Sequence, residues 1–253
     1  MNCYFLTKFA HYKDTYFFKS KQYLNKVLRV TSSKNILEIA SKVLWSESES
    51  IKRSIDHLNE DFVKSVHEIF HTKGRFVITG IGKSAHIAAK LVATLNSTGT
   101  PSLFMHAAEA VHGDLGMITK DDVIMCISKS GNSPEIKVLV PLLKRDGNTL
   151  IGMTANKESF LGKASNFVID CSIEKESCPN NLAPTDSTTV QLAMGDALAV
   201  SLMHLRNFSA NDFAKFHPGG ALGKKLLLKV EDILSHTQSG CISKYQRNYF
   251  RNF

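Results

Sequence analysis

The chain has 253 residues, of which 43% are hydrophobic, and this length and composition fit one large α/β domain. The net charge of +8 is confined to the two ends: residues 1–30 carry six basic residues and one acid, residues 241–253 carry three and none, and residues 31–240 carry 22 of each. A body without excess charge argues against a groove for nucleic acid. We therefore expect a basic N-terminal extension (1–30), one domain (31–235) and a basic C-terminal tail (236–253).

The five cysteines are scattered along the chain without CxxC spacing, which fits reduced thiols in a cytoplasm better than a disulfide framework. No stretch reaches the roughly 18 apolar residues of a membrane span. The N-terminus mixes aromatic residues with lysines where a secretion signal has an unbroken apolar run. We expect a soluble, cytoplasmic protein that binds neither a membrane nor nucleic acid.

In chain order, the first folding signal is an apolar pattern at helical spacing between residues 35 and 72, which predicts two helices ahead of the first strand. Strands and helices then alternate. Strands are predicted at residues 76–79, 102–105, 123–128, 149–154 and 167–171, and helices at 83–96, 107–111, 133–145 and just after Asn156. Five such repeats predict a three-layer αβα sandwich with a five-stranded parallel sheet, doubly wound in the flavodoxin-like manner.

A long helix is predicted over residues 187–207, and apolar side chains occupy most of its faces. Such a helix is buried on several sides, which indicates that another subunit covers part of it. Ser209, with Asp212 three residues later, predicts a capping box at the start of a further helix, and the sequence HPGG at residues 217–220 ends that helix.

The sequence RFVITGIGKSAHIAAK at residues 75–90 has the pattern of a buried strand, a glycine turn and a helix start. It is not a Walker A loop, because Val77 stands where that motif needs its first glycine. It fits the dinucleotide fingerprint G-x-G-x-x-A from Gly80, but the next strand ends without the acid that binds the ribose. We therefore expect this turn to present backbone N–H groups to a phosphate, with a nicotinamide dinucleotide as the weaker alternative.

A second polar turn, SKSGNSPE at residues 128–135, follows the third predicted strand. Three serine hydroxyls and the unpaired N–H groups of the next helix can bind a phosphate through many neutral donors. A plain serine N-cap is the alternative for any one such turn. Because ligands of open parallel sheets bind beyond the carboxyl ends of the strands, two turns of this kind indicate one phosphate-binding site.

Six segments of the sequence, each occurring once, form a recognisable series. In chain order they are GIGKSAHIAAK, STGTPS, HAAEAVHGDLGMI, ISKSGNSPEI, APTDSTT with MGDALAV, and FHPGGALGKKLL. Together they resemble the sugar isomerase (SIS) domain of arabinose 5-phosphate isomerases, over about residues 35–234. The resemblance implies an enzyme that interconverts D-ribulose 5-phosphate and D-arabinose 5-phosphate, the first step toward the lipopolysaccharide sugar 3-deoxy-D-manno-octulosonate. Many such enzymes carry a C-terminal pair of CBS domains, and the chain resembles the short form without that pair.

The resemblance also implies roles for individual residues. The catalytic candidates are Lys83, Glu135, Glu176 and His217. The candidates for substrate binding are Ser84, Gly99, Thr100, His112, Ser128, Ser130 and Ser133, and His106 falls where family members can hold a metal ion. The alternative for each charged residue is structural: a solvated charge at a helix start, a loop carboxylate, or a histidine satisfied by its own neighbours. Lys129, Asn132 and Ala107 depart from the asparagine, glutamate and proline that are usual in this family.

In the mechanism that we expect, Glu135 is the base that moves a proton between C1 and C2, Lys83 stabilises the enediolate, and His217 shuttles a proton to the sugar oxygen. No cofactor is expected to be required, and a divalent metal is expected only as an inhibitor. The expected partners are a sugar phosphate, further copies of the chain in a tetramer with a shared site, and a nucleotide-activated octulosonate as a feedback ligand. The alternatives are a non-catalytic SIS module that binds a sugar phosphate or a nucleotide sugar, and another SIS sugar-phosphate isomerase.

Overall fold

The computed structural model describes residues 33–220, and its centre is a parallel sheet in the order β2-β1-β3-β4-β5. The five strands are β1 (Phe76–Gly80), β2 (Ser102–His106), β3 (Val123–Ile127), β4 (Leu150–Thr154) and β5 (Phe167–Asp170). All four neighbouring pairs are parallel, with Phe76 opposite Ser102 on one side and opposite Val123 on the other. This order confirms the predicted doubly wound sheet, and its switch point lies between β1 and β3.

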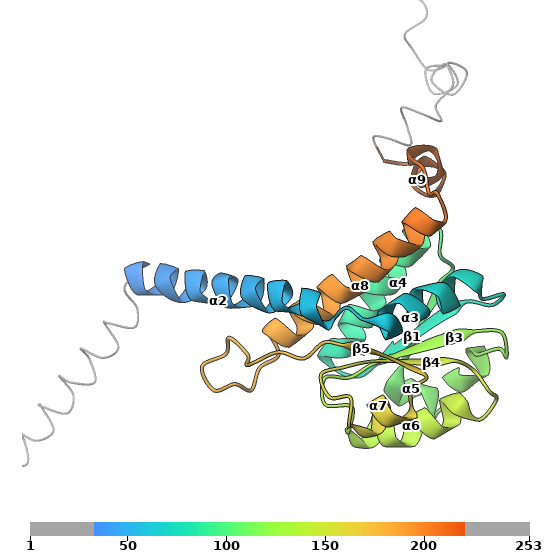
Figure 1. The fold of residues 1–253 in the computed structure, drawn as a ribbon, viewed down its shortest axis with the longest axis horizontal. Coiled ribbons are helices and arrows are strands. Elements are labelled where there is room, and N and C mark those ends of the chain that lie inside the picture. Colours follow the sequence, from blue (N-terminus) through green and yellow to red (C-terminus); the bar gives the residue numbers. More distant parts are fainter. Residues whose placement is uncertain (1–32, 221–253) are drawn as a thin grey trace, which may run out of the picture.

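Helices cover both faces of the sheet (Figure 1). One face packs against α3 (Glu60–His71), α4 (Lys83–Ser97) and α8 (Asp186–Leu205), and the other packs against α5 (Ala107–Ala110), α6 (Pro134–Lys144) and α7 (Phe160–Ala164). A 3-10 turn, η2 (Asp114–Met117), joins α5 to β3. Because both faces are covered, β1, β3 and β4 are buried at every position, which explains why they read as unbroken apolar runs.

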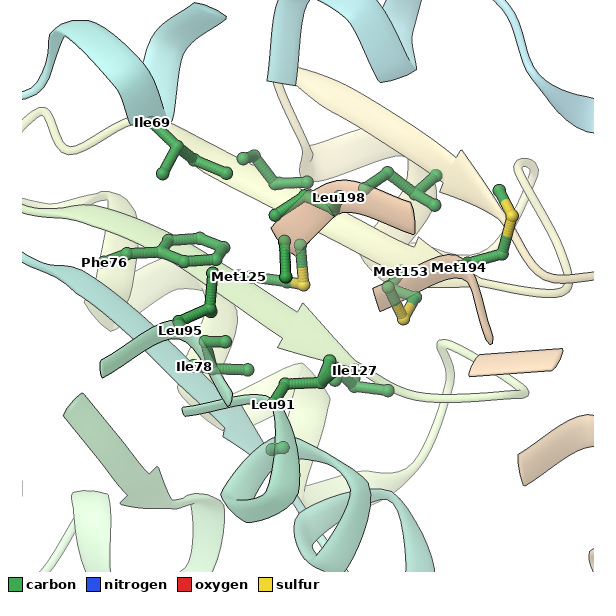
Figure 2. Close-up of a cluster of buried hydrophobic side chains, with 14 of the residues drawn as sticks. Ile69, Phe76, Ile78, Leu91, Leu95, Met125, Ile127, Met153, Met194 and Leu198 are labelled. Carbon is green, nitrogen blue, oxygen red and sulfur yellow. The ribbon is translucent and has the colours of Figure 1, made fainter. Parts of the chain in front are cut away.

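Alternate residues of β1, β2, β3 and β4 enter two separate cores. Phe76 and Ile78 of β1 face the α4 and α8 side, whereas Val77 faces α6. Figure 2 shows the first core, in which Leu91 and Leu95 of α4 meet Met125 of β3 and Leu198 of α8. The two cores fix the sheet between its helices and so set the positions of the loops at both of its edges.

The predicted helical region before β1 contains α2 (Ser33–Arg53), a 3-10 turn η1 (Ser54–His57) and α3, whose first turn is capped by the side chain of Asn59. Only part of α2 lies against the body, and its first half extends away from it (Figure 1). Five large apolar side chains between residues 36 and 45 of α2 are at least half exposed: Ile36, Leu37, Ile39, Leu44 and Trp45. The two predicted helices are therefore confirmed, and α3 and the end of α2 pack on the body, while residues 36–45 of α2 present an apolar surface.

The long helix α8 begins and ends within two residues of its predicted bounds. It lies so close to α4 that a Cβ atom on Gly195 would come within 2.3 Å of Leu91, while Val200 on another face is 61% exposed. The predicted capping box is confirmed, because Ser209 and Asp212 bond each other's backbone at the start of α9 (Ala210–Phe216). Since α8 has 20 residues and is about 30 Å long, α9 lies far from the loop that precedes α8 (Figure 1).

Two of the predicted segments, 1–30 and 236–253, lie outside the described residues, as does the end of the predicted domain. Within residues 33–220, none of the helices combines the length and the apolar character needed to cross a membrane.

Candidate active site

The turn after β1 has the geometry that its glycines predict. Gly82 adopts a positive φ of 57° as the N-cap of α4, and a Cβ on Gly80 would lie 3.1 Å from the carbonyl carbon of Ser84 and 3.2 Å from the carbonyl oxygen of Ile127. Among the described side chains, none caps the start of α4. Lys83 is exposed in this first turn, and the Ser84 hydroxyl lies 3.4 Å from Oε1 of the buried Gln191. The turn therefore presents backbone N–H groups and a lysine at the carboxyl edge of the sheet.

The serine loop, residues 128–133, follows β3 beside this turn. Ser128 Oγ accepts a hydrogen bond from Gly131 N (3.2 Å), and Ser130 Oγ accepts one from Asn132 N (3.3 Å). Ser133 is the N-cap of α6. A serine N-cap is the structural alternative that the sequence left open for this turn. Since each hydroxyl accepts these bonds, its proton is still able to donate to a ligand.

The serine loop rests on the start of α7. Gly131 has a φ of +62°, and a Cβ atom there would lie 2.1 Å from Ser159 Oγ. The Gly131 carbonyl accepts a hydrogen bond from Leu161 N (3.0 Å), and Asn132 Oδ1 accepts one from Phe160 N (3.0 Å). Asn132, which stands where this family usually has a glutamate, therefore attaches the serine loop to the start of α7.

The carboxylate of Glu176 lies in the loop between β5 and α8, with no exposed side-chain surface. Its Oε1 accepts hydrogen bonds from Lys129 Nζ (2.6 Å) and Ser187 Oγ (2.5 Å). Its Oε2 accepts from Thr185 N (2.8 Å), Ser187 N (3.2 Å) and Thr185 Oγ1 (3.2 Å). Burial raises the pKa of Glu176, but the hydrogen bonds from Lys129, Ser187 and Thr185 outweigh burial and lower this pKa to about 2. Glu176 is thus a buried anion that holds the serine loop and the start of α8 together.

Asp186 is a second buried carboxylate in the first turn of α8. It accepts hydrogen bonds from Ser46 Oγ (2.8 Å) and Ser50 Oγ (3.0 Å) of α2, and from the backbone N (2.6 Å) and hydroxyl (2.5 Å) of Ser177. Burial raises its pKa, and these bonds together lower it to about 2. Two anions at the start of α8 are favoured by the helix dipole, and they attach α2 and the loop before α8 to this helix.

Three other predicted residues lie along the same edge of the sheet. His106 ends β2 and accepts a hydrogen bond through Nδ1 from Ala108 N (3.3 Å), as the N-cap of α5. His112 is exposed in the turn after α5, and Glu135 is exposed in the first turn of α6. No cluster of three His, Cys, Asp or Glu side chains that could hold a metal ion occurs within residues 33–220.

The remaining predicted residues lie at the opposite end of the molecule. Gly99 and Thr100 follow α4, and Thr100 Oγ1 accepts a hydrogen bond from Arg206 Nε (3.2 Å) at the end of α8. His217 follows α9, stacks on Phe213 (3.9 Å between ring centroids) and donates through Nδ1 to the carbonyl of that residue (2.9 Å). Since α4 is about 22 Å long and α8 about 30 Å, one chain does not bring this second group to the carboxyl edge.

The motifs did not identify four polar residues that shape the site: Lys129 as a bridge, Thr185 as a partly buried donor at the N-cap of α8, and Ser187 and Gln191 as buried polar groups. A sequence signal existed for the last three, because they are polar residues at the start of an otherwise apolar helix. Buried polar groups such as Ser187 and Gln191 require partners and so mark a site or a junction.

The fold and these loops define a doubly wound α/β protein with two polar turns at its switch point, each leading into a helix N-terminus of the kind that can bind an anion. The family model described as SIS domain matches residues 68–201, just over half of the chain, and the chain belongs to that family.

Curated relatives extend the similarity beyond the domain. The chain is 50% identical over 207 residues to "Arabinose 5-phosphate isomerase KdsD" of Pseudomonas aeruginosa, covering 82% of this chain and 64% of that protein. It is 50% identical over 200 residues to "Arabinose 5-phosphate isomerase KdsD" of Yersinia pestis, covering 79% and 61%. The chain therefore spans about three fifths of the length of these relatives.

Solved structures give the same family. The protein c3406 of Escherichia coli CFT073, solved in complex with arabinose 5-phosphate, superposes with a TM-score of 0.72 at 38% identity. The alignment covers 74% of this chain and all of that one.

Proposed function

We propose that the protein is an aldose–ketose isomerase that interconverts D-ribulose 5-phosphate and D-arabinose 5-phosphate. The observation that carries this proposal is the meeting, at the β1–β3 switch point, of the uncapped start of α4 and the serine loop, with Lys83 and Glu135 exposed on either side. The identity to relatives named arabinose 5-phosphate isomerase supports this substrate within the larger set of sugar phosphates.

In this proposal the phosphate is bound mainly by neutral donors. The hydroxyls of Ser84, Ser128, Ser130 and Ser133 and the backbone N–H groups of α4 would surround it. Neutral donors suit a ligand that must be released after each turnover, and Lys83 would add one positive charge. His112, exposed beside the same edge, would contact the sugar.

Isomerisation requires a base that moves a proton between C1 and C2, and a cation or donors for the enediolate. We assign the base to Glu135, since its carboxylate is exposed one turn beyond the serine loop, and the enediolate charge to Lys83. Glu176 is bonded by five donors and has a pKa of about 2, so its role in this assignment is to stay ionised and position the loops.

His217 would complete the site from a neighbouring subunit. Within one chain it is separated from Glu176 by the length of α8, and Gly99 and Thr100 lie with it at that end. The exposed apolar part of α2 is a surface that a second copy can cover, which supports the expected homo-oligomer, a tetramer in our proposal.

Mixed oligomers test this shared site. Co-expression of Glu135→Gln subunits with His217→Asn subunits should restore part of the activity, because some sites would combine an intact Glu135 with an intact His217. The control is a mixture of Glu135→Gln and Lys83→Met subunits, whose residues lie in one group and should not complement. Recovery in both mixtures, or in neither, would contradict the assignment of these residues to different subunits.

Cytoplasmic location, a divalent metal that inhibits by binding near His106, and feedback by a nucleotide-activated octulosonate remain part of the proposal. Titration of the protein with that nucleotide sugar in a calorimeter tests the feedback ligand, and absence of binding removes it.

The experiment that tests the function is incubation of the purified protein with D-ribulose 5-phosphate and a chelator, followed by identification of the product. Formation of D-arabinose 5-phosphate would support the isomerase and exclude a need for a loosely bound metal. No conversion, together with thermal stabilisation by the sugar phosphate, would favour the non-catalytic SIS module. Faster conversion of another sugar phosphate would favour a different SIS isomerase.

A further inference from the structure

Lys129 joins two loops that are remote in sequence. It stands between Ser128 and Ser130 in the serine loop, and its Nζ lies 2.6 Å from Oε1 of Glu176, 47 residues later. Its own carbonyl accepts hydrogen bonds from Ala155 N (3.0 Å) and Thr154 Oγ1 (3.2 Å) at the end of β4. The backbone of Lys129 is therefore fixed on the sheet while its side chain extends to the loop before α8.

The ion pair is asymmetric in its exposure. The side chain of Glu176 has no exposed surface, whereas that of Lys129 is 42% exposed. A lysine on the surface gains little from pairing, but a buried carboxylate that loses its cation keeps its desolvation cost. The bond therefore matters mainly for the position and the charge of Glu176.

Lys129 is the cation bonded to Glu176 among the described residues. Lys42 of α2, Lys175 and Cys178 line a cavity of about 530 Å³ that also reaches Glu176, but no ion pair joins these lysines to it within residues 33–220. On the other side, the Thr185 hydroxyl lies 3.2 Å from Glu176 and 3.1 Å from the second buried anion, Asp186. The Thr185 hydroxyl has one proton and can donate it to Glu176 or to Asp186, but not to both at once. The neutral donors therefore satisfy the negative charge of Glu176 only in part, and the positive charge of Lys129 offsets the remainder.

The geometry points to Lys129 as a positioning residue of the proposed isomerase site: its ammonium ties the serine loop to Glu176 and, through Glu176, to the first turn of α8. This inference rests on the proposed function for its catalytic consequence, although the tie itself does not depend on catalysis. Because the loops that carry Ser128 and Ser130 form the proposed phosphate site, a loop released from Glu176 should bind the phosphate in a poorer geometry. A displacement of about 1 Å can reduce kcat/KM by about 100-fold.

The variant Lys129→Met removes the charge and keeps the length of the side chain, and Lys129→Arg keeps the charge. Lys120→Met is the matched control, because Lys120 is exposed before β3, at the opposite edge of the sheet, and forms no ion pair with the described residues. We expect Lys129→Met to reduce kcat/KM by at least about tenfold, mainly through KM, and to move the acid limb of its pH profile upward because Glu176 loses its cation. Lys129→Arg should recover most of both effects, and Lys120→Met should match the wild type.

A wild-type pH profile and KM in Lys129→Met would overturn the inference. If Lys129→Met does not fold, Lys129→Gln, which keeps a donor without charge, gives the same comparison. Hydrogen exchange without ligand separates this inference from the proposed function. Faster exchange in residues 128–133 and 185–187 of the Lys129 variants supports the tie even if the wild type proves inactive on D-ribulose 5-phosphate, and unchanged exchange in both segments refutes it even if the wild type is active.

Discussion

Protonation of Glu176 should destabilise the protein in acid. Its carboxylate is buried and accepts five hydrogen bonds, which lower its pKa from the ordinary 4.5 to about 2. A group whose pKa is lower in the folded state stabilises that state above its unfolded pKa, and this contribution is lost as the pH falls toward the folded pKa. At about 1.4 kcal/mol per pKa unit, the shift corresponds to about 3 kcal/mol at pH 7, of which about 1 kcal/mol remains at pH 3.

Urea unfolding at a fixed protein concentration, followed by circular dichroism at pH 7, 5, 4 and 3, measures this effect. Glu176→Gln should lower the free energy of unfolding by about 3 kcal/mol at pH 7, but by only about 1 kcal/mol at pH 3. The control is Glu158→Gln, because Glu158 pairs with Lys163 on the surface and such pairs contribute little. If the deficit of Glu176→Gln were the same at pH 3 as at pH 7, the assignment of the low pKa to the buried, hydrogen-bonded carboxylate would be wrong.

Three further substitutions test the site and the core. Glu135→Gln should reduce kcat by about 10²–10⁴-fold with an unchanged unfolding midpoint, because Glu135 is an exposed base in our proposal; a near-normal rate in a coupled assay would remove that assignment. Gly131→Ala should destabilise the protein more than Gly147→Ala in thermal unfolding, since both glycines have a positive φ but only Gly131 meets a neighbour, Ser159 Oγ, at 2.1 Å; equal losses would mean that the contact relaxes without cost. Leu91→Ala should cost about 2–5 kcal/mol in urea unfolding, because Leu91 is 2% exposed between α4 and α8, and a smaller loss would indicate that the two helices move together to fill the space.

The sheet and most of its helices could be predicted because their signals are local. Central parallel strands are buried on both faces and therefore appear as short apolar runs, and the glycines of the β1 turn and the capping box at Ser209 mark helix starts directly. The serine loop could also be predicted as a polar turn at the carboxyl edge. The contacts that hold this loop in place could not be predicted. Asn132 accepts a hydrogen bond from Phe160 N, and Lys129 donates one to Glu176. The sequence spacing of these pairs carries no information on such contacts.

The environment of Glu176 could not be predicted for the same reason. In the sequence, Glu176 is a single acid in a polar loop, and this pattern fits a catalytic residue and a solvated charge equally well. Its five hydrogen bonds come from Lys129, Thr185 and Ser187, and they show that Glu176 is a buried anion and not a solvated charge. The resemblance makes Glu176 a catalytic candidate, and that role stays a prediction. Its donors show in addition that its carboxylate joins the serine loop to the start of α8.

The position of α8 relates these observations to the assembly. Its first turn carries Asp186 and contacts Glu176, and its last turn leads to Arg206, which bonds Thr100 near His217. One rigid helix thus sets the separation of the two groups of candidate residues at about 30 Å. A change of conformation that brought them together within one chain would have to break both buried anion networks, whereas a second copy could supply the missing group without any change in the first. Subunit association should therefore be required for catalysis, and activity should fall on dilution before the protein unfolds.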